Sequence, residues 1–305
     1  MIRQAAFIDH NKMLKGALHC HTTRSDGAGA PGDVIRLHAE NGYVFMAITD
    51  HRQYNYKNYA PETDMIIVPG MEIDRDFYGE DGRCFHAVSI GPAREDGNGF
   101  AQDEKTGSGK VVDQYSFQHA LDDLHAKNNM TIYCHPEWSN TFSRDFERLT
   151  GNFAMEIWNT GCAVVHDLDT NAACWDELLL QNTRIYGVAT DDGHDMSHHC
   201  KGWVMVNATP DLNSILSSLK AGAFYSSCGP VIRDFYVEDG KAVIECSPCV
   251  QIGFRYGRAP TFIISDDNAI LTRAEFSVPA RFKYIRAVVK DANGNRAWSN
   301  PIFFD

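Results

Sequence analysis

The amino-acid sequence predicts an α/β protein in which a large barrel precedes a small all-β unit. Up to about residue 230, short apolar segments alternate with helical segments, a pattern typical of parallel strands joined by helices. From about Val231 onward the helical segments stop, and strand-like segments are separated by turns such as Glu238-Asp239-Gly240. We therefore expect two units: a large barrel at residues 1–230 and a β-sandwich-like unit at residues 231–305.

The expected helices and strands follow from periodicity and from their end signals. A helix from Pro31 to Gly42 has proline near its first turn and glycine at its end. Other helices are expected from Ser116 past Leu124, at about 165–180, and at 210–220 with Thr209 as the N-cap. Short apolar runs predict barrel strands at residues 43–48, 65–68, 84–90, 131–134, 153–158, 184–189 and 202–206. Strands of the second unit are expected at residues 235–237, 242–246, 251–256, 262–265, 274–278, 283–289 and 302–304.

Charge and cysteine content limit the classes of function. The net charge of −12 disfavours a grip on long nucleic acid, because phosphate binding requires a basic surface. It leaves open a small phosphorylated substrate, since bound cations reverse the local charge. The nine cysteines are scattered and odd in number, which favours reduced thiols in a cytoplasmic protein. We find neither a signal peptide nor a run of ~18 apolar residues, and expect no membrane segment.

Histidines and carboxylates recur where the expected strands end. His19, His21 and Asp26 follow the first apolar run, and His51 follows the second. His135 and the Asp191-Asp192-Gly193-His194 segment follow two later ones. In a β/α barrel these strand ends meet at one rim. Imidazole nitrogens and carboxylate oxygens are ligands for Zn, Mn and Fe, so the sequence predicts a metal site there.

Taken together, these motifs resemble the PHP (polymerase and histidinol phosphatase) family. They are His19-x-His21-x4-Asp26, Thr49-Asp50-His51, Gly70-Met71-Glu72, His135-Pro136 and Asp192-x-His194, in the order of that family. The resemblance covers about residues 15–230. It implies a distorted (β/α)7 barrel with two or three divalent metal ions, a trinuclear centre of Zn, Mn or Fe. The ligands that it implies are His19, His21, Asp26, His51, Glu72, His86, His135, Asp192 and His194. Asp192 is preferred over Asp191, which is kept as a neighbouring or substrate contact.

The resemblance also implies a reaction, the hydrolysis of a phosphate ester by a hydroxide that bridges two metal ions. No further catalytic residue is expected beyond that hydroxide. Glu72 suits a bridging role because a carboxylate offers two oxygens. A substrate phosphate also favours cationic partners. Arg24, Arg52, Arg144 and His198 are candidates because they lie near predicted ligands in the chain.

Several side chains are expected to be structural. His38, His119 and His125 lie in expected helices without partners in the motif pattern, and His166 begins a helix. Cys20 points away from its histidine neighbours in an extended segment, so we expect it in the core. Cys246 and Cys249 form a lone pair without a second pair to complete a zinc ribbon.

Four functions compete at this point. The first is a phosphoesterase acting on a small metabolite or nucleotide. The second is a nucleoside bisphosphate phosphatase or an exonuclease for short oligonucleotides, as in relatives with a similar HxHx4D motif. The third is a non-catalytic protein that binds through its C-terminal β unit, because a fold does not fix a function. The fourth is metal-assisted hydrolysis of a C–N bond. The sequence leaves the substrate, the native metal and the oligomeric state open.

Overall fold

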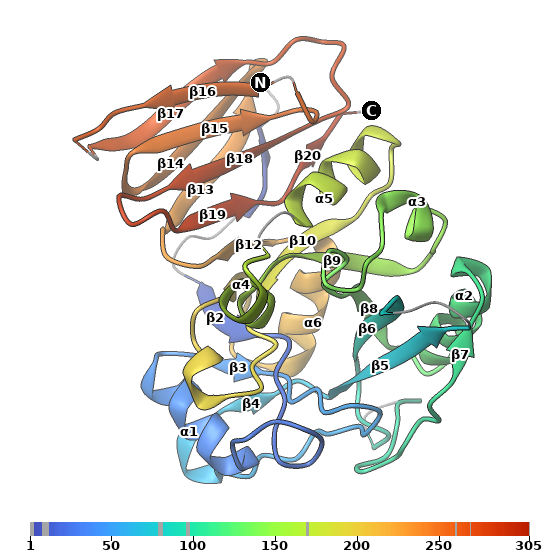
Figure 1. The fold of residues 1–305 in the computed structure, drawn as a ribbon. Helices are drawn as coiled ribbons and strands as arrows, with labels where there is room; N and C mark the ends of the chain where they lie inside the picture. The colour runs from blue at the N-terminus through green and yellow to red at the C-terminus, as the bar shows by residue number, and fades with distance from the viewer. Residues whose placement is uncertain are drawn as a thin grey trace.

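The computed structural model describes residues 3–7, 12–78, 82–95, 98–168, 171–259, 261–268 and 270–304. Figure 1 shows an α/β body with a stack of antiparallel strands at one end. The two parts are joined within one sheet, because the ladder of the α/β body continues from β12 (Phe224–Ser227) into β19 (Arg296–Ser299). The fold is therefore α/β with an additional C-terminal region of antiparallel strands.

One wall of the α/β body belongs to a ten-stranded sheet in the order β16-β15-β18-β19-β12-β11-β2-β3-β4, with the tenth strand, β20, paired to β18. Its barrel strands, besides β12, are β2 (Met13–Ala17), β3 (Phe45–Met46), β4 (Ile66–Ile67) and β11 (Trp203–Asn207). β2, β3 and β4 run parallel, whereas β11 is antiparallel to both β2 and β12. The parallel trio directs the segments after β2 and β3 to the same rim.

The other wall is a six-stranded sheet in the order β10-β9-β8-β6-β5-β7. Its strands are β5 (Gly70–Phe77), β6 (Cys84–Ile90), β7 (Lys110–Val111), β8 (Met130–Tyr133), β9 (Asn152–Asn159) and β10 (Tyr186–Thr190). β8, β9 and β10 are parallel as expected. Glu72 lies inside β5, which pairs antiparallel with β6, and so differs from the ligands that follow a strand end.

Hydrogen bonds join the two sheets at two places, which makes the body a distorted barrel. At the first, the Ser226 hydroxyl of β12 accepts from the Ala189 N–H and donates to the Gly187 carbonyl of β10. At the second, the Gly91 N–H, just after β6, donates to the Pro69 carbonyl, just after β4. A buried apolar cluster draws on both sheets, with Leu18, Phe45, Val68, Val88, Ile132, Ala154, Val188, Val204 and Phe224 among its members.

The helices are α1 (Pro31–Glu40), α2 (Gln114–His125), α3 (Ser143–Phe146), α4 (Thr160–His166), α5 (Asn171–Leu180) and α6 (Leu212–Ala221), with 3-10 turns η1 (Pro61–Thr63) and η2 (Met196–His198). The single helix expected at 165–180 was wrong, because two helices lie there. α4 begins earlier, at Thr160, and ends where Asp167 takes a left-handed backbone conformation, and α5 begins at Asn171. Two caps also differ, because Asp113 caps α2 and Asp211 caps α6. None of the helices in the described ranges combines the length and apolar character that crossing a membrane needs.

The C-terminal strands form two facing layers. One is the four-stranded sheet β1-β13-β14-β17, with β1 (Arg3–Ala5), β13 (Ile232–Glu238), β14 (Lys241–Cys249) and β17 (Leu271–Ser277). The other contains β15 (Gln251–Arg255), β16 (Thr261–Ser265), β18 (Tyr284–Lys290), β19 and the short β20 (Ile302–Phe303). Phe235 and Ile244 from the first layer and Ile252 and Ala287 from the second share one buried core. β1 comes from the start of the chain, so the division at residue 230 stays a prediction.

A buried ion pair links the barrel to this second region. The Arg286 guanidinium of β18 donates from Nε and Nη2 to the two carboxylate oxygens of Asp176 in α5, at 2.9 and 2.7 Å. The Tyr284 hydroxyl donates to the same carboxylate, and the Arg286 guanidinium lies 4.4 Å from the Trp175 ring centroid. Such a pair is costly to break, because removing one member leaves the other as an unpaired buried charge.

We therefore predict that Asp176→Asn destabilises the protein by about 3–5 kcal/mol. Urea unfolding followed by circular dichroism measures the change. Asp123→Asn, at an exposed position of α2, is the matched control and should change the free energy of unfolding by no more than about 0.5 kcal/mol. Equal stabilities of the two variants would contradict the proposed importance of the pair.

Candidate metal centre

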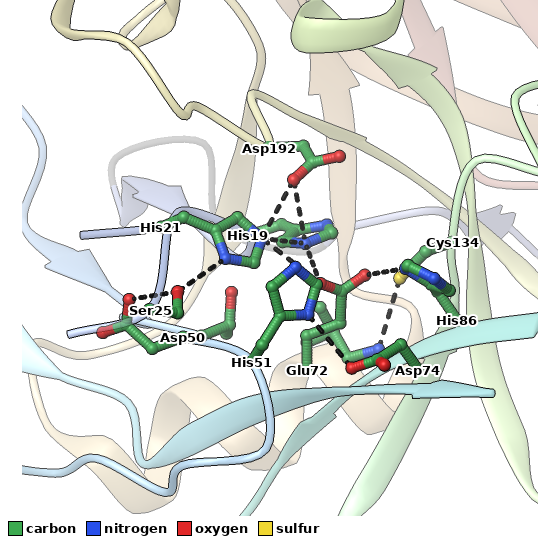
Figure 2. A network of polar contacts seen from close by, with 12 residues as sticks. His19, His21, Ser25, Asp50, His51, Glu72, Asp74, His86, Cys134 and Asp192 are labelled. Atoms are coloured by element: carbon green, nitrogen blue, oxygen red, sulfur yellow. Dashed lines mark hydrogen bonds and ion pairs between the residues drawn. The ribbon is translucent and has the colours of Figure 1, made fainter. Parts of the chain in front are cut away.

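Side chains from five places in the chain converge on the barrel rim. They come from the loop after β2, the loop after β3, the β5–β6 ladder, the segment after β8 and the segment after β10 (Figure 2). The structure brings together all nine residues for which the resemblance implies metal binding: His19, His21, Asp26, His51, Glu72, His86, His135, Asp192 and His194. The chain thus assembles an oxygen- and nitrogen-rich centre from residues far apart in sequence.

Glu72 lies at the middle of this centre and is almost completely buried. Its Oε2 atom lies 3.4 Å from His19 Nε2, 3.2 Å from His21 Nε2 and 3.1 Å from His51 Nδ1. Its Oε1 atom lies 3.0 Å from His86 Nδ1 and 3.4 Å from His135 Nε2. Each oxygen therefore serves a different set of imidazoles, and the carboxylate divides the centre into two halves.

The antiparallel pairing of β5 and β6 forms one side of the centre. Glu72 and Asp74 are two residues apart on β5, so they point to the same face of the strand. Asp74 is the register partner of His86 on β6, which puts His86 on that face as well. The Asp74 carboxylate lies 3.2 Å from His51 Nδ1 and also pairs with Arg52. The β5–β6 ladder therefore presents Glu72, Asp74 and His86 on one face.

The two adjacent aspartates after β10 have opposite orientations. Asp192 points into the centre, with Oδ1 3.0 Å from His21 Nε2 and 3.2 Å from His19 Nε2 (Figure 2). Asp191 points away and accepts the backbone N–H groups of residues 200, 201 and 202. Asp192 has a φ of 48°, a left-handed conformation that reverses the chain between them. Asp192 is thus the member of the pair that is available to the centre.

A third group lies at the more exposed side. Asp26 Oδ2 lies 3.5 Å from His51 Nε2 and 3.5 Å from His194 Nε2, and the His21 and His194 rings stack with centroids 4.2 Å apart. One potential ligand atom from each of His21, Asp26, His51 and His194 falls within 4.8 Å of the other three. Figure 2 shows His51, a member of this group, beside Glu72.

Burial and neighbouring charges shift the pKa values at the centre in opposite directions. Burial alone lowers the pKa of His19, but the carboxylates of Asp192, Glu72 and Glu156 raise it well above its usual value. Burial likewise raises the pKa of Glu72, yet the surrounding imidazoles, His19 and His86 first, lower it well below its usual range. Without a cation, protons on the imidazoles balance the carboxylate charges.

The donor set fits divalent metal ions. Oδ1 of Asp192 and Nδ1 of His51 are buried and make no well-directed hydrogen bond within the described residues. Nε2 of His19 and Nε2 of His21 lie only 3.1 Å apart, and both face the same two carboxylates. Imidazole nitrogens and carboxylate oxygens that converge this closely are the ligands that a divalent cation would bind in place of the protons.

Sequence reasoning missed Glu156, a fully buried carboxylate behind the centre. Its Oε1 accepts from His19 Nδ1 at 2.7 Å and from the Thr190 hydroxyl at 2.6 Å. Its Oε2 accepts from the His135 backbone N–H and from the Asn159 amide, both at 2.9 Å. Glu156 thus places the proton of His19 on Nδ1 and leaves Nε2 free to bind metal. The available signal was a lone acidic residue in the apolar strand FAMEIW.

The predicted cationic substrate contacts divide into two groups. Arg24 and Arg52 line a hollow of about 360 Å³ beside Asp26 and His51, with Lys105 also in its wall. Arg24 pairs with Asp103, and Arg52 pairs with Asp74. Arg144 lies on α3, 4.7 Å from the Phe142 ring centroid, and lines neither this hollow nor the cavity at the centre.

A cavity of about 420 Å³ opens directly onto the centre. Seven of the nine predicted ligands form its polar end, and His198 is also in its wall. Trp138, Val165 and His166 form the opposite side, and the Trp138 ring lies 5.0 Å from the His135 ring between centroids. The expectation of a purely structural His166 therefore missed its place in the cavity wall. The cavity has the size of a small-molecule site.

Comparison with known proteins shows the same architecture. A two-domain protein from Bacteroides vulgatus, described as containing a predicted PHP-like metal-dependent phosphoesterase, superposes with a TM-score of 0.50 at 12% identity, covering 98% of both chains. An amidohydrolase structure from Chromobacterium violaceum gives a TM-score of 0.45 at 17% identity, covering 68% of this chain and 96% of that one. The superposition on the Bacteroides vulgatus protein confirms the two-domain PHP-like fold expected from the sequence.

At the sequence level the similarity is local. The DNA polymerase/3'-5' exonuclease PolX of Bacillus subtilis (strain 168) is 35% identical over an alignment of 79 residues, which covers 20% of this chain and 14% of the relative. The match thus spans about a seventh of the length of that relative. No protein-family model matches the chain.

We predict that Glu156→Gln weakens metal binding about 10–100-fold, because an amide holds the His19 tautomer less firmly than a carboxylate. Isothermal titration of the metal-free protein with Zn²⁺ or Mn²⁺ measures the affinity. Glu40→Gln, an exposed change at the end of α1, should leave the affinity unaltered. An unchanged affinity in Glu156→Gln would show that His19 needs no such partner.

Metal affinity should also fall as the pH falls. In the metal-free protein, burial lowers the pKa of His51, but the adjacent carboxylates of Asp26 and Asp74 raise it to about 10. His51 is therefore protonated at neutral pH, and a metal ion must displace that proton. We expect the apparent affinity to drop about tenfold per pH unit for each proton displaced, between about pH 9 and pH 6. Chelator competition measures this slope, and a flat profile would contradict it.

Proposed function

We propose that this chain is a PHP-family phosphoesterase that uses divalent metal ions to hydrolyse a phosphate ester of a small metabolite or nucleotide. The observation that carries the proposal is the convergence of five imidazoles on the two oxygens of Glu72 at the barrel rim. A small-molecule-sized cavity beside them supports it. The C-terminal β region then has a supporting role rather than the primary binding role.

Two to three ions of the Zn, Mn or Fe type fit the three groups of donors. The inner ligands would be His19, His21, Glu72 and Asp192, with His86 and His135 on one side and Asp26, His51 and His194 on the other. When bound, such ions supply a water of lowered pKa and positive charge for the phosphoryl oxygens. The side chains of the protein would orient the ions and the substrate.

The polypeptide orients the ligands and shapes the cavity. Glu156 holds His19, and Ser139 donates to or accepts from His135 Nδ1 at 3.0 Å, which fixes the ring that faces Glu72. Arg24 lines the 360 Å³ hollow beside Asp26 and would contact a phosphate oxygen there. Trp138 and Val165 offer apolar contacts to the organic part of a substrate and keep water from that side.

Replacement of Asp192 by Asn tests the proposal. The change removes a charge that faces two imidazoles, and we expect kcat for a phosphomonoester to fall about a hundredfold or more. A colorimetric phosphate assay with Zn²⁺, Mn²⁺ or Fe²⁺ measures the rate. Asp239→Asn, in the exposed turn between β13 and β14, is the matched control. Undiminished activity in Asp192→Asn, or a wild-type protein that binds no metal, would overturn the proposal.

A second candidate is 3'-5' trimming of short oligonucleotides. It is favoured by the 79-residue similarity to a protein named as a DNA polymerase and exonuclease. Arg24, Arg52 and Lys105 beside the centre would contact further phosphates of such a substrate. Turnover of a short oligonucleotide should fall steeply with salt, whereas turnover of a small phosphomonoester should not. Activity on amides but not on phosphoesters would instead favour C–N bond hydrolysis.

A further inference from the structure

A second group of metal-binding side chains lies behind the rim and shares no residue with the candidate centre. It consists of His38 on α1, Asp191 at the end of β10 and His199 just after η2. Their exposed fractions are 0%, 0% and 4%. One potential ligand atom from each lies within 4.8 Å of the other two, the same closeness that groups His21, Asp26, His51 and His194 at the rim.

The histidines of this inner group have unused nitrogens. His38 Nδ1 lies 2.8 Å from the Val34 carbonyl, which only accepts, so the proton is on Nδ1 and Nε2 carries the lone pair. Nε2 of His38 and Nδ1 of His199 are both buried without a hydrogen-bond partner in the described ranges. Burial lowers the pKa of His38 to about 4, so its imidazole is neutral near pH 7. Neutral imidazoles are the form that binds metal.

The surroundings of these nitrogens are also unsatisfied. The His38 and His199 rings meet edge-on with centroids 5.3 Å apart, and the Tyr43 ring lies 4.8 Å from His38. The Tyr43 hydroxyl is a third buried polar group without a partner in the described ranges. Polar atoms are rarely buried in this way without water or an ion between them.

Asp191 adds a buried negative charge. Its two oxygens accept three backbone N–H groups at 2.6–3.0 Å, yet it makes no ion pair within the described residues. Lys15, the basic side chain nearby, instead donates to the Asn41 carbonyl and lies over the Tyr43 and Trp203 rings. A buried carboxylate without a cation is costly, and a metal ion would supply the missing charge.

We propose that His38, Asp191 and His199 bind a structural divalent cation, separate from the ions of the rim. Two imidazole nitrogens and one carboxylate oxygen in a closed, buried setting suit Zn²⁺, with the Tyr43 hydroxyl or a water as the fourth ligand. The ion would tie α1, β10 and the segment after η2 together. Because Asp191 precedes Asp192, the ion would also hold the chain reversal that points Asp192 into the rim. His38, which the sequence predicts to be structural, would then have a specific structural role as a metal ligand.

The closeness of His199 to the chain reversal supports this link. A Cβ atom added to Gly193 would come within 2.4 Å of His199 Nδ1, so glycine is needed for the ring to pack against this turn. A His199 ring held by a metal ion would therefore also restrict the turn that carries Asp192 and His194.

The direct test is X-ray diffraction of full-length protein crystallised with Zn²⁺, recorded on both sides of the zinc absorption edge. We expect an anomalous peak between His38 and His199, in addition to any at the rim. Density for water alone, or no peak, at full occupancy of the rim would overturn the proposal. This measurement uses the wild-type chain and does not depend on the folding of a variant.

Metal counting by plasma mass spectrometry provides the second test. His38→Gln and His199→Gln should each lose one zinc ion per chain relative to the wild type, whereas His119→Gln, at an exposed position of α2, should lose none. Asp26→Asn should retain the inner ion, which separates this site from the rim. Unchanged zinc content in both His38→Gln and His199→Gln would overturn the proposal, whatever the phosphoesterase assay shows.

Discussion

The buried carboxylate of Glu72 is the constraint on which the rest of the barrel rim depends. Burying a charge is costly unless it is paired, and here five imidazoles surround the two oxygens of one side chain. Those imidazoles come from four separate places in the chain, so the carboxylate can be satisfied only when the barrel is complete. The same contacts that balance Glu72 in the metal-free protein are the contacts that metal ions would replace.

Around this core, a second layer of polar groups fixes each ligand. Glu156 sets the tautomer of His19, and Ser139 orients His135. Asp50 accepts from the Thr22 backbone N–H, the Thr22 hydroxyl and the Ser25 hydroxyl, and so shapes the loop that carries His21 and Asp26. The rim therefore resembles a preorganised site rather than a loose collection of histidines, because its ligands are positioned before any ion binds.

The adjacent aspartates Asp191 and Asp192 link the two proposed metal sites. Asp191 faces the inner histidines and Asp192 faces the rim. Asp192 itself has the left-handed backbone conformation. Such an arrangement would let an ion at the inner site stabilise the geometry of the rim without reaching the cavity. It would also explain why the buried side chains behind α1 include His38, Asp191 and His199, which an apolar core would otherwise exclude.

The sequence by itself determined the class of fold and the chemical nature of the rim. The order of His19, His21, His51, His135 and His194 after apolar runs was enough, because parallel strands end on one side of a barrel. The antiparallel pairing of β5 with β6, which places Glu72 inside a strand, was not visible, because a short apolar run looks the same in either direction. Only the tertiary structure decided the partners of each carboxylate. Glu156 reads as an ordinary strand residue until folding brings it 2.7 Å from His19, 137 positions away along the chain.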